Sequence, residues 1–226
     1  MRRKFATPIC VLVLTVVGSL AAELEAQESR DPRRVGRREV LSRSQEIALA
    51  RSAAPASVSD SAAVYVFTDT GYVMASRGSN GVACYVSRSW PASIEPHCFD
   101  AEGVATIMRM HMREVELLHR GVSLDDAERE IGGGIAAGRF RLPRRPVMSY
   151  MMSAGQALIS DDGRPVGNWK PHVMIYYPYL ESTDIHRGKP DLQAGVVSGG
   201  GSVNANFTIV MPEFVAVRQP TAPSRP

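Results

Sequence analysis

Histidine and serine are the residues of this chain with the most obvious capacity for chemistry. The five histidines are His97, His111, His119, His172 and His186. No two of them share a zinc-binding HExxH motif, and the sequence has neither a GxSxG nor an SxxK nucleophile motif. Catalytic triads are defined in space rather than along the chain, so a dispersed Ser/His/Asp set remains open.

His172 is the best candidate for a functional imidazole. It follows Pro171 and begins the segment 172–177, whose large side chains on both faces predict a strand in the middle of a sheet. There the ring could line a cleft and exchange protons near neutral pH. The alternative is a structural hydrogen bond between the ring and a neighbouring loop. A hydrolase or metal-dependent enzyme using His172 requires a polar partner within about 3 Å of the ring.

Cysteine usage predicts one disulfide and no metal site. The chain has three cysteines, of which Cys10 lies in the apolar run near the start and Cys84 and Cys98 lie far downstream. An even pair in an oxidising compartment favours a disulfide between Cys84 and Cys98, the alternative being two buried thiols. Neither residue has a second cysteine at close spacing, which disfavours a metal pair, although His97 adjoins Cys98.

The first 26 residues predict an export signal. A basic head, Arg2-Arg3-Lys4, precedes the apolar run 9–22 (ICVLVLTVVGSLAA) and small residues that end near Ala26. The run is shorter than the roughly 20 residues that cross a bilayer, as in a cleaved signal peptide. Arg2-Arg3 also resembles the opening of a twin-arginine signal, an ordinary basic head being the alternative. We expect a secreted or periplasmic protein.

Composition divides the rest of the chain into three parts. Residues 27–41 are rich in arginine and predict a disordered basic linker, and residues 218–226 are rich in proline and predict a disordered tail. Residues 42–217 remain as one globular domain.

Removing three basic and two acidic residues with the signal leaves 23 basic and 21 acidic side chains. This mild balance argues against nucleic acid as a partner, and no later segment is apolar enough to span a membrane.

Residue patterns predict an α+β domain with a mostly antiparallel sheet and two to three helices. Ser42 and Ser123 are predicted helix caps, and a longer helix is predicted over 103–119. Three strands joined by tight turns predict a meander over 63–87. The later strands are predicted at 147–153, 156–160, 172–177, 194–198 and 207–211. Three consecutive glycines, 132–134, predict either a helix end or close packing against another backbone.

Methionine and tyrosine gather in two of these predicted strands. They are Met148, Tyr150, Met151, Met152, Met174, Tyr176, Tyr177 and Tyr179. If the two strands pair, their thioethers and phenols form an adaptable apolar wall that could bind an apolar ligand. The alternative is that they fill the core.

Four segments together resemble a group of exported bacterial proteins to which no activity is attached. They are GSNGVAC (78–84), CFD (98–100), SYMM (149–152) and PHVM (171–174). The resemblance implies one exported domain and transfers no catalytic residue.

The absence of a catalytic motif and the Met/Tyr-rich strands favour an exported domain that binds a small apolar ligand or an envelope protein. The alternative is the hydrolase or metal-dependent enzyme centred on His172. A third possibility is an envelope structural protein that attaches through its arginine-rich arm. No cofactor is predicted.

Overall fold

One eight-stranded sheet organises the residues that a computed structural model describes, namely 37–160, 164–165, 170–186 and 196–218. The strands are β1 (Ala63–Thr68), β2 (Gly71–Ser76), β3 (Ala83–Ser87), β4 (Glu95–Phe99), β5 (Val147–Met151), β6 (His172–Tyr176), β7 (Val196–Ser198) and β8 (Asn206–Val210). Their order is β2-β1-β3-β4-β5-β6-β8-β7. Only the β1–β3 pairing is parallel. The prediction of an α+β domain with a mostly antiparallel sheet is confirmed.

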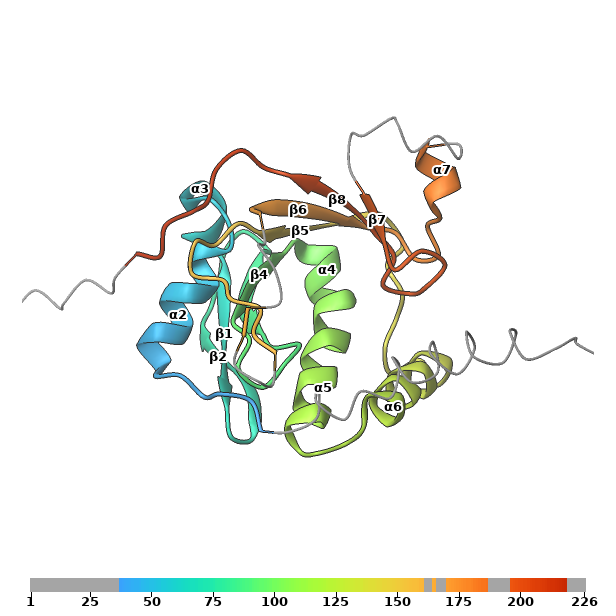
Figure 1. The fold of residues 1–226 in the computed structure, drawn as a ribbon, viewed down its shortest axis with the longest axis horizontal. Helices are drawn as coiled ribbons and strands as arrows, with labels where there is room; N and C mark the ends of the chain where they lie inside the picture. The colour runs from blue at the N-terminus through green and yellow to red at the C-terminus, as the bar shows by residue number, and fades with distance from the viewer. Residues whose placement is uncertain (1–36, 161–163, 166–169, 187–195, 219–226) are drawn as a thin grey trace, which may run out of the picture. The chain divides into compact units, whose positions relative to one another are not determined.

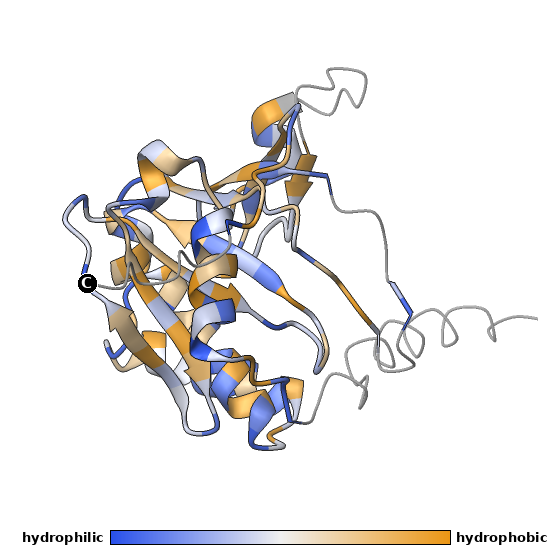
Figure 2. Ribbon diagram, turned by 90° about the vertical axis from the view of Figure 1, so that its left-hand side faces the viewer, coloured by the Kyte–Doolittle hydropathy of each residue, from blue (hydrophilic) through white to orange (hydrophobic). Residues whose placement is uncertain are grey.

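Helices cover both faces of the sheet (Figure 1). The three longer ones are α2 (Arg43–Ser52), α5 (Ile107–His119) and α6 (Leu124–Ala136), and the short ones are α3 (Ala56–Ser59), α4 (Ala101–Ala105) and α7 (Ser182–His186). Helix α2 packs on β1, β3 and β4, and α4 and α5 pack on the opposite face. Helix α6 packs against α5. The helices carry both polar and apolar residues, as amphipathic helices packed on one side do (Figure 2).

Alternation along the strands creates two separate cores. Tyr85 and Phe99 point towards α5, where they join Ile107 and Met108. Cys84 and Cys98 point towards α2, where they lie among buried alanines and valines. The two cysteines are directly opposed on β3 and β4 and form the predicted disulfide.

Both predicted helix caps are present. The Ser42 hydroxyl accepts a hydrogen bond from the Gln45 amide, and the Gln45 side chain accepts one from the Ser42 amide, which completes a capping box. The Ser123 hydroxyl accepts a hydrogen bond from the Asp126 amide at the start of α6. These local signals fix where α2 and α6 begin.

The predicted meander over 63–87 is wrong in one respect. Strands β1 and β2 form the expected hairpin, but β3 pairs with β1 in parallel on the side away from β2. The chain crosses back over β1 through residues 77–82 before it enters β3. Gly78 permits this crossing, since a Cβ at that position would lie 2.1 Å from the Ala63 backbone nitrogen.

Strand β4 is not among the strands predicted from the sequence. Pro96 argues against a strand in this segment, because proline has no N–H to donate to a neighbouring strand. In the structure Pro96 lies opposite Val86 of β3, whereas β4 pairs with β5 only through Cys98 and Phe99. The proline therefore faces no β5 partner that would need its missing N–H.

The helix predicted over 103–119 is divided into α4 and α5 at Thr106. The Thr106 hydroxyl donates to the Glu102 carbonyl at 2.5 Å, and its backbone leaves the helical region (φ −132°, ψ −92°). The predicted strand at 156–160 is reduced to isolated bridges at Ala157 and Ile159.

The folded part begins before Ser42. Arg38, which was predicted to lie in a disordered linker, is only 2% exposed. Its backbone amide donates to Nδ1 of His119 at 2.8 Å, and its guanidinium donates to the Arg88 and Ser89 carbonyls. The predicted signal peptide, the linker up to residue 36 and the tail from residue 219 lie outside the described residues.

Charged side chains occupy the outer edge of β2. Glu116 of α5 accepts a hydrogen bond from the Tyr72 amide at 3.1 Å, and Arg43 of α2 donates to the Ala75 carbonyl at 2.8 Å. Both backbone groups would otherwise be available to another strand. This edge is therefore protected against pairing with a second chain.

Alanine substitutions at the three consecutive glycines of α6 should affect stability in opposite directions. Nothing lies within 4 Å of a Cβ added at Gly132 or Gly133, whereas a Cβ at Gly134 would lie 2.5 Å from a ring carbon of Phe140. Alanine at 132 or 133 should raise the free energy of unfolding by about 0.5–1 kcal/mol, because glycine is a poor helix former. Alanine at 134 should lower it by about 1–3 kcal/mol through overpacking. Urea unfolding of the three single variants checks this, and equal effects at all three positions would contradict it.

Candidate functional site

A cluster of aromatic and polar side chains lies between the sheet and α5, and all of them are buried except His111, which is half-buried. His97 of β4 and Ser149 of β5 are joined by a 2.9 Å hydrogen bond between Nε2 and Oγ. The His97 ring stacks on Tyr85 with centroids 5.8 Å apart, and His111 of α5 lies 6.2 Å from it. The Tyr176 ring lies 5.9 Å from the His111 ring. The topology thus brings together residues from four neighbouring strands, β3 to β6, and a helix.

Burial keeps this cluster neutral. Desolvation lowers the pKa of His97 well below its usual range, and the nearby His111 and His172 rings add to the effect. Desolvation likewise lowers the pKa of His111 to about 4. It raises the pKa of the Tyr85 and Tyr176 phenols. These histidines and tyrosines are therefore uncharged at neutral pH.

The His97–Ser149 pair has the hydroxyl and imidazole of a catalytic serine–histidine dyad, but it lacks solvent access and a carboxylate that orients the ring. Ser149 is fully buried and His97 is 4% exposed, so the hydroxyl does not face solvent. Within the described part of the chain, no carboxylate hydrogen-bonds to the His97 ring to orient it. The pair therefore satisfies two buried polar groups of the core.

The structure places His172 at the start of β6, 9% exposed, between β5 and β8. Its central strand position is as predicted. Nδ1 lies 2.7 Å from the carbonyl oxygen of Lys170, so the polar partner of this nitrogen is the neighbouring loop backbone. His119 is also engaged, since its Nδ1 accepts from Arg38. No group of three or more His, Cys, Asp or Glu side chains with metal-binding geometry occurs among the described residues.

The neutral histidines predict a loss of stability in weak acid. Histidine in the unfolded chain has a pKa of about 6.5, and the folded value for His111 is lower, at about 4. Below pH 6.5 the unfolded chain binds more protons than the folded chain. The free energy of unfolding therefore falls as the pH is lowered, until the pH reaches the pKa of the folded state. Each such histidine contributes up to about 1.4 kcal/mol per pH unit.

Urea unfolding at pH 7.0, 6.0 and 5.0 measures this dependence. The variant His111→Gln removes one titrating ring, so its stability should fall less steeply over the same range. A parent protein as stable at pH 5.0 as at pH 7.0, or a variant with an unchanged slope, would refute the assignment.

The two strands rich in methionine and tyrosine, β5 and β6, are paired. Their side chains fill the core instead of lining an open wall. Met151, Met174 and Tyr176 belong to the buried cluster on the α5 face. Tyr177 and Tyr179, which follow β6, are more than half exposed. A ligand site must therefore be sought elsewhere.

An open groove runs along α5, with a volume of about 330 Å³. Its apolar lining is Tyr65 of β1, Val104 of α4, Met108 and Met112 of α5, and Phe140 from the loop after α6. Its polar lining is Arg109, Arg113 and Glu116 of α5. The volume lies at the lower end of the range for small-molecule sites.

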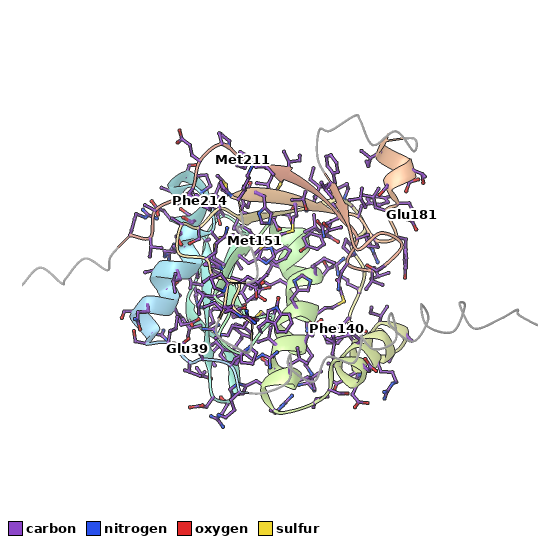
Figure 3. The ribbon with its side chains drawn as sticks, in the orientation of Figure 1. Glu39, Phe140, Met151, Glu181, Met211 and Phe214 are labelled. Carbon is purple, nitrogen blue, oxygen red and sulfur yellow. A yellow bond between two sulfur atoms is a disulfide. The ribbon has the colours of Figure 1, made fainter. Side chains whose placement is uncertain are left out.

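Successive turns of α5 supply most of the groove. Met108, Met112 and Glu116 follow one another at intervals of four residues on α5, which places them on one stripe, and Val104 of α4 adds to the lining. Phe140 is held beside this stripe, because its amide donates to the Gly134 carbonyl at 3.1 Å and Gly134 lacks the Cβ that would displace its ring. Figure 3 shows Phe140 beside α5, far from Met211.

The arginines of the groove differ in their partners. Arg113 pairs with Glu130 of α6 at 2.6 Å and lies 3.8 Å from Glu116. Arg109 is exposed, and in the described part of the chain it has no hydrogen bond or ion pair. The groove thus combines an apolar floor with one guanidinium available to a ligand.

The described residues form an α+β domain with an open, mostly apolar groove along α5. No protein-family model, curated protein or solved structure matches the chain. No helix in the described ranges is long and apolar enough to cross a bilayer. The function must therefore be argued from the groove itself.

Proposed function

We propose that this chain is an exported binding domain that holds one small, partly apolar ligand in the α5 groove. The observation that carries the proposal is the lining: five apolar side chains, two of them methionines, around an open volume of about 330 Å³. Methionine adapts its shape to apolar ligands at low cost. Both methionines belong to the lining of this open groove.

Export is the second part of the proposal. The disulfide between Cys84 and Cys98 supports it, because such bonds persist in oxidising compartments. The basic and apolar pattern of residues 1–26 supports it independently. Expression of the full chain in a bacterial host, followed by cell fractionation and intact mass, should give a secreted or periplasmic product that starts near residue 27. A cytoplasmic product that retains residues 1–26 would refute export.

The geometry gives no support to the alternative of an enzyme using His172. Its ring nitrogen Nδ1 is engaged by the Lys170 carbonyl, and the ring is not among the groove residues. The binding proposal does not depend on this histidine.

A small neutral fluorescent probe, 1-naphthylamine, tests binding directly. The parent protein should bind it with saturable enhancement of emission. The variant Met112→Trp fills the groove and should weaken binding at least tenfold, because the ligand would have to displace a packed ring. Met211→Trp makes the same change far from the groove and serves as the matched control.

Two results would overturn the proposed function. One is the absence of saturable probe binding to the folded parent protein. The other is equal weakening by Met112→Trp and Met211→Trp, which would place the probe outside the groove. Circular dichroism of each variant confirms that it is folded before its binding is compared.

A further inference from the structure

We infer that the ligand of the α5 groove is an anionic amphiphile, a short hydrocarbon chain that ends in a carboxylate. The inference rests on the proposed function and adds the chemical class of the ligand. The apolar floor would hold the chain, and the guanidinium of Arg109 would hold the carboxylate.

Charge in the groove favours an anion. The lining contains two arginines and one glutamate, so it carries one more positive than negative side chain. Arg109 and Arg113 are four residues apart on α5, a spacing at which like charges repel. Glu116 and Glu130 offset Arg113, but neither pairs with Arg109. A bound anion would compensate the remaining charge.

The same contacts disfavour a cationic ligand. Glu116 is the only carboxylate of the lining. One of its oxygens accepts from the Tyr72 amide at 3.1 Å, and the other lies 3.8 Å from Arg113. Binding a cation there would disturb the contact that protects the edge of β2. Arginine, by contrast, offers a planar donor pair that matches a carboxylate.

The size of the groove limits the hydrocarbon chain. A volume of about 330 Å³ corresponds to about eleven water molecules at roughly 30 Å³ each. This suits a ligand of about ten non-hydrogen atoms. Octanoate has this size and is the probe of choice.

Three eight-carbon probes separate charge from apolar binding. Isothermal titration should rank octanoate above 1-octanol, and 1-octanol above octylammonium. The variant Arg109→Gln should weaken octanoate about tenfold, the typical effect of losing one charged hydrogen bond, and should weaken the uncharged 1-octanol less. Arg120→Gln, at the end of α5 and outside the groove, is the matched control and should change neither.

The failures of the two proposals are distinguishable. If 1-octanol binds as tightly as octanoate, or if Arg109→Gln and Arg120→Gln affect octanoate equally, the carboxylate assignment is overturned while the groove remains a binding site. If neither the three eight-carbon probes nor 1-naphthylamine binds, the proposed function itself fails.

Discussion

Replacing Arg88 with methionine should lower the free energy of unfolding by about 3–5 kcal/mol, because it leaves the carboxylate of Glu46 buried without its counter-charge. Both side chains are fully buried and form an ion pair between the end of β3 and α2. The guanidinium also donates to the Glu39 and Val86 carbonyls and lies 4.9 Å from the Phe67 ring centroid. Burial raises the pKa of Glu46, and the Arg88 charge opposes that rise.

A double-variant cycle measured by urea unfolding checks this expectation. Arg88→Met combined with Glu46→Leu should recover much of the loss, since no isolated charge then remains in the core. The control is Arg129→Met, which breaks the exposed pair with Asp126 and should cost less than about 1 kcal/mol. If Arg88→Met costs no more than Arg129→Met, the buried pair contributes nothing and the expectation is wrong.

Removing the disulfide is the second change with a large expected effect. Replacing Cys84 and Cys98 together by alanine should lower the free energy of unfolding by about 3 kcal/mol, the chain-entropy value for a loop of this length. Both sulfur positions are fully buried between β3, β4 and α2. The double variant also removes apolar contacts there, which acts in the same direction.

The measurement compares urea unfolding of the parent, oxidised and reduced, with that of the double variant. The reduced parent and the double variant should both unfold at lower urea than the oxidised parent. A thiol assay of the denatured, unreduced parent should find neither Cys84 nor Cys98 free. Free thiols at both positions, or equal stability of all three forms, would contradict the disulfide and its contribution.

Local signals in the sequence predicted much of the fold. The hydroxyls of Ser42 and Ser123 define helix starts through contacts three residues away. The hairpin of β1 and β2 follows from one turn, and the disulfide follows from a count of cysteines. Each of these features depends on neighbours in the chain or on residue type alone.

Non-local features were not predictable in the same way. The parallel pairing of β3 with β1 depends on a crossing that Gly78 allows by contact with the Ala63 backbone. Pro96 makes β4 hard to predict as a strand, because proline has no N–H for a neighbouring strand. This would matter only if β5 paired with β4 at Pro96, and β5 pairs only at Cys98 and Phe99. Whether Arg38 is buried depends on Arg88 and His119, both far along the chain.

The groove was missed for the same reason. Tyr65, Val104 and Phe140 come from three separate segments, and only the fold brings them together. Two signals pointed towards it. The spacing of Met108 and Met112 put two adaptable side chains on one face of a helix, and Gly134 marked the place where Phe140 would pack. The conspicuous methionines and tyrosines of β5 and β6 belonged to the core instead.

Nuclear magnetic resonance of the protein carrying ¹³C-methyl methionine tests the central claim most directly, because each methionine reports on its own surroundings. On titration with octanoate, we predict saturable shifts of the Met108 and Met112 methyl signals, which line the groove. The Met152 and Met211 signals should stay in place, because these residues are not part of its lining. Saturable shifts at Met152 or Met211 with none at Met108 and Met112, or no shift at any methionine, would contradict a ligand site along α5.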